Sequence, residues 1–250
     1  MTQAMILCAG FGTRLNELTK NTPKPMLKIG DKPILEHTII NLKKSGINRI
    51  IINLHYLADQ ITSYFGDGRK WGVEIVYSYE DVPLGTAGAV KKVENILSES
   101  ENFLVLYGDI VTNQDYRELM DFHKSKKDAI ASIIVHERIK SNSIVEMDDD
   151  NKVVKFLERP SENEIKDKKQ NWVNSGLYCF NKEILSIIPE GKSDFPKDVF
   201  SKLVELNALY GFPLTGYRCA IDSSERYFMV RLNYDKGLIF DTRNLSEKWH

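Results

Sequence analysis

Cysteine is scarce in this chain of 250 residues, and its three cysteines form no CxxC pair. Cys8, Cys179 and Cys219 lie far apart, which argues against a disulfide framework and against a zinc knuckle. We therefore expect three buried, reduced thiols. The five histidines include no HExxH spacing and no other metal constellation. Structural or solvated roles are the better interpretation for them.

An excess of one charge and a long apolar run are also missing. Lys and Arg number 34 and Asp and Glu number 35, so the net charge of −1 predicts no broad basic surface for nucleic acid or an anionic membrane. No stretch approaches the roughly 20 apolar residues of a membrane span, and no basic n-region precedes an apolar run. These absences favour a cytoplasmic enzyme or binding protein that binds any anion locally.

The first half of the chain alternates strand and helix patterns. A short apolar run at residues 4–8 predicts a strand buried on both faces, the spacing at 34–42 predicts a helix, and 49–54 is again strand-like. The alternation continues to a strand at 103–107. It predicts an α/β fold with a Rossmann-like, mostly parallel central sheet flanked by helices.

The pattern changes after Asp128, where turns replace helices between successive strand candidates. This change predicts a smaller β-rich sub-region in the C-terminal half, followed by a helix near 195–205 and a last strand at 217–221. No repeat or low-complexity linker is present. We expect one domain over 1–250, with parts at 1–127 and 128–227 and a C-terminal tail at 228–250. The strand candidates of the second part are 129–135, 143–147, 153–157 and 172–180.

A glycine-rich turn directly follows the first strand. Gly10 and Gly12 would let main-chain N–H groups approach a phosphate, since glycine adopts positive φ and has no side chain. The turn lacks the third glycine of the dinucleotide fingerprint, and no Gly-Lys-Ser/Thr follows as in a Walker loop. Taken alone, the pattern fits a tight turn as well as a phosphate loop.

The residues after this turn add more specific motifs. Gly12-Thr13-Arg14-Leu15 is followed by Thr22-Pro23-Lys24-Pro25-Met26-Leu27 and by Lys32-Pro33-Ile34-Leu35. In this order the chain resembles the sugar-1-phosphate nucleotidyltransferase family, also called nucleotide-sugar pyrophosphorylases. The resemblance continues through Pro83–Ala89, Leu106–Asp109, Phe156–Pro160 and Trp172–Tyr178, and it ends near Tyr227. It implies an enzyme of the EC 2.7.7 type that uses Mg²⁺, an NTP and a sugar-1-phosphate.

Three charged residues have roles that physical chemistry supports beside the resemblance. In nucleotidyl transfer the acceptor phosphate attacks the α-phosphorus, so the protein must position two polyanions and neutralise their charge. Arg14 offers a planar fork for the leaving β- and γ-phosphates. Lys24, held extended by its flanking prolines, is assigned to the α-phosphate. Asp109 is a hard-oxygen ligand for Mg²⁺; an isolated Gly-Asp would more often be a turn or an N-cap.

The resemblance also implies the residues that bind the two substrates. Two of these residues also have a purely structural interpretation. Gly88 fits close helix packing, and Glu158 fits a surface ion pair with Arg159 or Lys155. Arg159 stands where the family usually has lysine. The implied nucleotide-binding residues are Leu7, Ala9, Gly10, Gly12, Thr13, Gly85, Thr86 and Gly88. The implied sugar-phosphate-binding residues are Glu158, Arg159, Asn174 and Gly176.

The second metal ligand of the family is displaced in this sequence. The family commonly carries an aspartate after the last core strand, and an ungapped alignment puts Ala220 there. Asp222 follows two residues later, on the same face of an extended strand and roughly 6–7 Å away. We therefore predict Asp109 and Asp222 as the Mg²⁺ ligands, provided that the strand end bends.

The nucleotide and the acceptor are less constrained. Pro83–Gly88 looks most like the turn of guanylyltransferases acting on mannose- or heptose-type phosphates, which would serve cell-surface polysaccharide biosynthesis. One alternative is a uridylyltransferase for an amino-sugar 1-phosphate, and another is a cytidylyltransferase for a non-sugar phosphate, suggested by Asp222. A non-catalytic nucleotide-sugar-binding subunit is the alternative from a different class. Oligomeric state stays open, with a homodimer as one arrangement.

Overall fold

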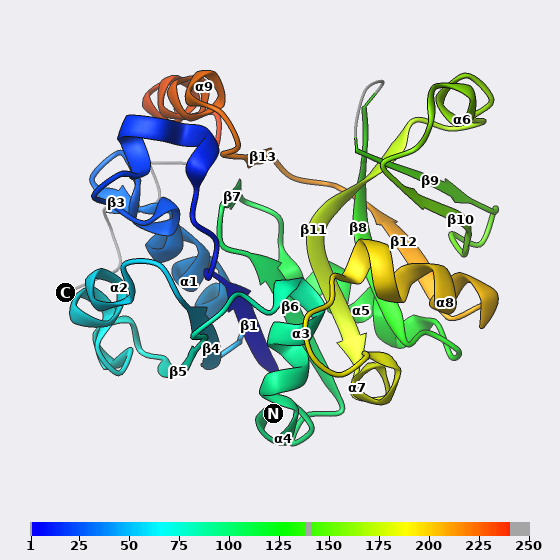
Figure 1. Ribbon diagram of the computed structural model, residues 1–250, viewed down its shortest axis with the longest axis horizontal. Helices are drawn as coiled ribbons and strands as arrows, with labels where there is room; N and C mark the ends of the chain where they lie inside the picture. Colours follow the sequence, from blue (N-terminus) through cyan, green and yellow to red (C-terminus); the bar gives the residue numbers. More distant parts are fainter. Residues whose placement is uncertain (1, 139–141, 241–250) are drawn as a thin grey trace.

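The computed structural model describes residues 2–138 and 142–240, and within them a nine-stranded mixed sheet forms the centre of the molecule (Figure 1). The strands of this sheet are β1 (Gln3–Leu7), β4 (Arg49–Leu54), β5 (Glu74–Tyr79), β6 (Asn102–Tyr107), β8 (Ala131–Glu137), β9 (Ser143–Met147), β10 (Val153–Glu158), β11 (Trp172–Asn181) and β12 (Leu209–Pro213). Two separate two-stranded sheets pair β2 (Lys28–Ile29) with β3 (Lys32–Pro33) and β7 (Ile110–Thr112) with β13 (Arg218–Ala220).

Helices cover both faces of this sheet. The α-helices are α1 (Ile34–Lys44), α2 (Ala58–Phe65), α3 (Gly85–Lys92), α4 (Glu94–Leu97), α5 (Tyr116–Ser125), α6 (Glu162–Lys166), α7 (Ile184–Ile187), α8 (Phe200–Glu205) and α9 (Ser224–Asp235). The 3₁₀-helices are η1 (Thr13–Thr19), η2 (Lys24–Met26) and η3 (Arg69–Trp71), and the π-helical turn is η4 (Phe195–Val199).

The first half of the chain forms the parallel part of the sheet. Strand β1 pairs in parallel with both β4 and β6, and β4 pairs in parallel with β5. Successive residues of β1 face opposite layers, as the period of two in a strand requires. Ala4 and Ile6 pack with α1, α2 and α5, whereas Met5 packs with α3 and α4. The predicted α/β class with its Rossmann-like parallel sheet is confirmed.

The second half extends the sheet with antiparallel strands. Strand β11 pairs antiparallel with β6 on one side and with β8 on the other, so it joins the two halves. The register between β8 and β11 shifts between Asn174 and Tyr178, which marks a bulge in β11. Strand β12 pairs in parallel with β8 and is not predicted by the sequence pattern.

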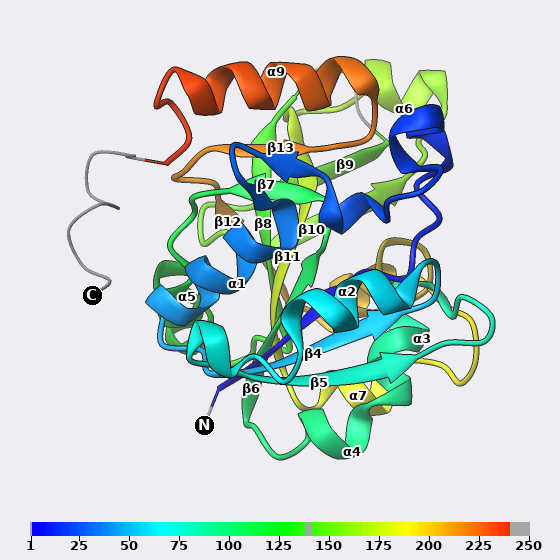
Figure 2. The same ribbon diagram turned by 90° about the vertical axis from the view of Figure 1, so that its left-hand side faces the viewer.

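A third group of elements lies beside the sheet and joins the two ends of the chain. Strand β13 pairs antiparallel with β7, and helix α9 lies across the top of the view in Figure 2. Val230 of α9 shares a buried cluster with Leu15 and Leu27 from the N-terminal region, and the Tyr227 hydroxyl donates to Lys28 O at 2.9 Å. The sequence pattern predicts a tail from 228 onward, where the structure has most of α9. Residues 241–250 of that tail lie outside the described residues.

Several smaller expectations can be compared with the structure. All three cysteines are buried and free, as predicted. Helices α3 and α4 meet at Val93, and α6 begins with a capping box between Ser161 and Glu164. Over the described ranges, no helix is long and apolar enough to cross a membrane.

Candidate active site

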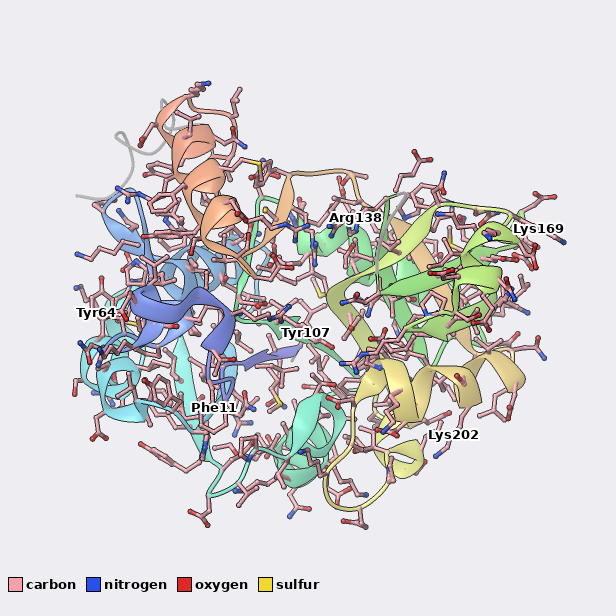
Figure 3. The ribbon with its side chains drawn as sticks, turned by 45° about the horizontal axis from the view of Figure 1, so that its top comes forward. Phe11, Tyr64, Tyr107, Arg138, Lys169 and Lys202 are labelled. Carbon is pink, nitrogen blue, oxygen red and sulfur yellow. The ribbon has the colours of Figure 1, made fainter. Side chains whose placement is uncertain are left out.

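A hollow of about 220 Å³ opens at the carboxyl ends of β1, β4, β5 and β6. Ligands of open α/β sheets gather at this edge, because the loops after parallel strands converge there. Tyr107, at the end of β6, lies between the two halves of the molecule in Figure 3. The lining residues are Leu7, Cys8, Ala9, Gly10, Lys24, Pro25, Asn53, Glu80, Pro83, Gly85, Thr86, Tyr107 and Asp109.

An ion pair between Lys24 and Asp109 lies in the wall of this hollow. Lys24 Nζ is 2.9 Å from Asp109 Oδ2, and the two side chains are 11% and 26% exposed. Pro23 is extended, with φ −64° and ψ 143°, but Lys24 begins the 3₁₀-helix η2 and is not extended as predicted; the buried Pro25 follows it in that helix. Asp109 lies between β6 and β7, with Gly108 separating it from β6. The two groups predicted to handle phosphate charge and metal thus meet in the structure.

The glycine-rich turn has two parts with different environments. Gly12 adopts φ +69°, and a Cβ there would approach Thr19 Cγ2 to 3.1 Å, so this glycine is required by the fold. Thr19 Oγ1 donates to Gly12 O at 2.9 Å and fixes the turn. Gly10 lines the hollow, and a Cβ there would meet no atom within 4 Å. Gly10 is therefore the glycine where a ligand can approach the main chain.

Arg14 is not brought to the Lys24–Asp109 pair. Its side chain is exposed on η1, and neither Arg14 nor Thr13 lines the hollow. Within the part of the chain that the structure describes, Arg14 forms no ion pair with an acidic side chain.

Two buried polar residues that sequence reasoning missed, Asn53 and Glu80, hold the loops around the hollow. Asn53 Oδ1 accepts from Cys8 N at 2.7 Å, and Asn53 Nδ2 donates to Glu80 Oε1 at 2.7 Å. Glu80 Oε2 accepts from Leu84 N at 2.8 Å. The network fixes the turn after β1 relative to the loop before α3. Its sequence signal is modest: a polar residue at or just after the end of each of two neighbouring predicted strands.

The N-terminus of α3 is closed by a segment about 110 residues further along the chain. Ala87 N and Gly88 N both donate to Ser193 O, at 2.9 and 3.1 Å. Thr86 N and Thr86 Oγ1 both donate to Asp194 Oδ1, at 2.9 and 3.1 Å. Gly88 is buried and does not line the hollow, whereas Gly85 and Thr86 do. The free N–H groups of this helix terminus are thus largely used by protein acceptors.

We expect Gly85→Ala to destabilise the protein by about 3 kcal/mol, because it combines two kinds of strain. Gly85 adopts φ +76°, and a Cβ there would lie 2.4 Å from Ser193 O. Gly191 is a matched control, since it has φ +79° but open space around a Cβ. Gly191→Ala should cost only about 1 kcal/mol. Chemical denaturation measures both, and equal effects would show that the contact with Ser193 is unimportant.

A chain of hydroxyl and amide groups connects β11 to the hollow. Asn174 Nδ2 donates to the Tyr178 hydroxyl at 2.8 Å, and that hydroxyl donates to the Tyr107 hydroxyl at 3.2 Å. Burial raises the pKa of Tyr107 to about 12, so this phenol stays protonated at neutral pH. Gly176 adopts φ +74° and packs against the Tyr107 ring. A Cβ added at Gly176 would lie 3.1 Å from Tyr107 Cδ2. Asn174 and Gly176 thus shape the wall behind Tyr107 without lining the hollow.

Glu158 and Arg159 lie at the end of β10, outside the lining of the hollow. Glu158 is half-buried; burial raises the pKa of its carboxyl group, with Arg159 acting against the rise and Asp194 adding to it. Lys155 is 3.6 Å from Glu146, so the ion pair that it forms is not with Glu158. Arg159 is exposed with φ 53°, and its N–H donates to Asn142 O.

Asp222 comes close to Asp109 along the paired backbone. Ala220 pairs with Ile110 across β13 and β7, and Ile221 N donates to Asp109 O at 2.9 Å. The Asp222 carboxylate is bound through Oδ2 by Arg226 Nη1 at 3.0 Å. Among the described residues, no group of three or more His, Cys, Asp or Glu side chains could hold a metal ion.

Comparison with known proteins gives a consistent family match. Residues 3–234 match the family model described as "Nucleotidyl transferase". The chain is 36% identical over 218 residues to a UTP–glucose-1-phosphate uridylyltransferase of Synechocystis, covering 81% of this chain and 55% of that protein. It is 34% identical over 220 residues to the mannose-1-phosphate guanylyltransferase catalytic subunit beta of Drosophila melanogaster, covering 86% and 58%. The chain thus spans a little over half the length of these relatives.

Solved structures are also similar. HddC from Yersinia pseudotuberculosis has a TM-score of 0.78 at 28% identity, covering 94% of this chain and 100% of that chain. HddC complexed with GMP-PN has a TM-score of 0.76 at 27% identity, with the same coverage. A structure described as a putative glucose-1-phosphate thymidylyltransferase from Bacillus anthracis reaches a TM-score of 0.82 at 21% identity, covering 93% of this chain and 94% of that chain, and supports the fold alone.

Proposed function

Because this chain belongs to the nucleotidyl transferase family, we propose that it joins an NTP and a sugar-1-phosphate to give an NDP-sugar and pyrophosphate. The observation that carries the proposal is the Lys24–Asp109 pair in a hollow beside Gly10 and Gly85. A cation beside an open stretch of main chain suits a triphosphate, and a carboxylate next to it suits the Mg²⁺ that would neutralise the phosphates. We assign residues 1–127 to the nucleotide and 128–227 to the acceptor.

The chemistry needs no nucleophile from the protein. An acceptor phosphate oxygen attacks the α-phosphorus in line, the new P–O bond forms, and the bond to the β-phosphate oxygen breaks to release pyrophosphate. Lys24 Nζ neutralises charge on the α-phosphate as the bond order changes. We assign Arg14 to the leaving β- and γ-phosphates, which its exposed side chain on η1 must swing inward to reach. Its planar, permanently charged fork suits that task.

The donor set is compatible with Mg²⁺. Asp109 and Asp222 each use one carboxylate oxygen, toward Lys24 and Arg226 respectively, and the second oxygens accept no hydrogen bond within the described ranges. Magnesium sites often use one or two carboxylates together with substrate phosphates. Asp109 and Asp222 would hold the ion, and the bound ion would supply charge neutralisation to the phosphates.

We expect Asp222→Ala to lower the affinity for the metal ion by about tenfold while the fold persists. The half-saturating Mg²⁺ concentration for turnover should rise, because one of two ligands is lost. A direct measurement is Mn²⁺ binding followed by electron paramagnetic resonance without substrates. Asp149→Asn, an exposed change in the β9–β10 turn, is the control. Unchanged Mn²⁺ affinity in Asp222→Ala would remove Asp222 from the metal site.

For the substrates, we propose GTP and a mannose- or heptose-type 1-phosphate. Support comes from the Pro83–Gly88 turn, from the Drosophila relative and from the HddC structure complexed with GMP-PN. A uridylyltransferase is the second candidate, because the Synechocystis relative at 36% identity carries that name. The GTP-dependent reaction would take place in the cytoplasm and serve cell-surface polysaccharide synthesis.

A matrix of four NTPs against several sugar-1-phosphates tests the proposal through pyrophosphate release. We expect release only when an NTP, a phosphorylated acceptor and Mg²⁺ are all present, with GTP and mannose-1-phosphate among the active pairs. Activity confined to UTP would favour the uridylyltransferase. An empty matrix that includes phosphocholine with CTP would favour a non-catalytic nucleotide-sugar-binding subunit.

A further inference from the structure

Arg218 is a partly buried cation next to the reaction centre that none of the assigned roles uses. It lies on β13 opposite Thr112 of β7, two residues before Ala220, which pairs with Ile110. The hydrogen bond from Ile221 N to Asp109 O continues this pairing as far as Asp109. Arg218 therefore belongs to a strand that runs alongside the predicted metal ligand.

The Arg218 guanidinium is fixed by a main-chain acceptor. Its Nε and Nη2 donate to Ser175 O at 3.1 and 2.8 Å. Ser175 lies in the β11 bulge, where pairing with β8 is interrupted, so its carbonyl is available to a side chain. Ser175 is fully buried, and its hydroxyl is 2.8 Å from His136 Nδ1. The guanidinium is thus held by rigid structure beside Asn174 and Gly176.

The charge of Arg218 is not matched by a bonded carboxylate. It forms no ion pair within 4 Å in the described ranges, and its Nη1 donates to no described residue. Burial lowers the pKa of the guanidinium, and the nearby Asp109 carboxylate raises it. Arg226 differs, because Asp222 binds it at 3.0 Å. A partly buried guanidinium that no carboxylate pairs with, and that keeps a free Nη1 edge, suits an anionic ligand.

We propose that Arg218 binds the phosphate group of the acceptor through its Nη1 edge. A guanidinium matches phosphate geometry, and anchoring by Ser175 O reduces the conformational entropy that binding must remove. Ala220, on the same face of β13, adds no negative charge that would repel the anion. This inference rests on the proposed function, since that function supplies an acceptor phosphate. The proposal places a fixed cation, Arg218, on β13 two residues before Ala220, the position where the family commonly has an aspartate.

The test is direct binding without catalysis. Inorganic phosphate and α-D-mannose 1-phosphate are titrated by calorimetry into the full chain in EDTA, without nucleotide, so that no metal bridges the anion. We expect saturable binding by the wild type and at least about tenfold weaker binding by Arg218→Met. Arg117→Met is the matched control, because Arg117 is an exposed arginine on α5, paired with Asp115.

Each outcome decides the proposal. No phosphate binding by the wild type, or wild-type affinity in Arg218→Met, would overturn it. If Arg218→Met does not fold, Arg218→Lys decides: it keeps the charge but loses the fork, so affinity should fall severalfold with an unchanged thermal midpoint. Unchanged affinity in that variant would also overturn the proposal. Arg218-dependent phosphate binding with an empty substrate matrix would refute the proposed function and leave the Arg218 site standing.

Discussion

Asp109→Asn should lower kcat by about 10³-fold while the protein stays folded. The carboxylate is 2.9 Å from Lys24 and forms no other hydrogen bond within the described residues, so an amide of the same size can replace it without a clash. What disappears is the negative charge, which both a magnesium ion and the lysine require. The large effect is therefore expected in turnover and not in stability.

Steady-state pyrophosphate release measures this effect, and the thermal midpoint checks the fold. Asp149→Asn makes the same chemical change at an exposed position in the β9–β10 turn and should leave kcat within about twofold. Asp109→Asn with kcat near the wild-type value would exclude a role for this carboxylate at the reaction centre. A large fall in the thermal midpoint would instead make Asp109 a structural residue.

Lys24→Met should lower kcat by about 10²–10³-fold, through loss of the charge that faces the α-phosphate. The Lys24 side chain is only 11% exposed, and methionine fills much of the same space. Removal of the lysine also leaves Asp109 without its ion-pair partner. Lys24→Arg should recover little of the activity, because the planar guanidinium cannot take the place of a compact ammonium between two prolines.

The separation of kcat from KM distinguishes this role from simple nucleotide binding. A group that acts mainly in the transition state lowers kcat and kcat/KM together, whereas one that binds substrate and transition state equally raises KM alone. We expect the first pattern for Lys24→Met. Lys28→Met, at an exposed lysine of β2, is the control. A rise in KM for the NTP at normal kcat would reduce Lys24 to a binding residue.

Local sequence patterns were sufficient for the parallel part of the fold. Strand β1 is buried against helices on both faces and reads as a continuous apolar run, whereas α1 buries one face and reads as a periodic segment. The extended Pro23 was also readable, since proline restricts its own backbone, whereas the 3₁₀-helix that begins at Lys24 was not. The position of Asp109 follows from the rule that strand ends of a parallel sheet converge, but Lys24 reaches it from η2, beyond the loop after β1.

Long-range contacts account for what the sequence did not reveal. The resemblance implied that Gly85, Thr86 and Gly88 bind the nucleotide, yet Ser193 and Asp194, more than 100 residues away, accept hydrogen bonds from the main chain of Thr86 and Gly88. The sequence of helix α9 shows little amphipathic periodicity. Only Tyr227 and Val230 of this helix are buried, and they pack against the N-terminal region. No sequence motif singles out Arg218, because its partner, the Ser175 carbonyl, is made available by the bulge in β11, more than 40 residues away.

The most direct test of nucleotidyl transfer is phosphorus NMR of the products. GTP and mannose-1-phosphate are incubated with the protein and Mg²⁺, and the phosphorus resonances are followed to completion. The proposed reaction predicts one pyrophosphate for each NDP-sugar, with both absent when the acceptor is omitted and with both formed about 10³-fold more slowly by Asp109→Asn. Inorganic phosphate and GDP as products, or pyrophosphate formed without an acceptor, would contradict transfer to a sugar phosphate.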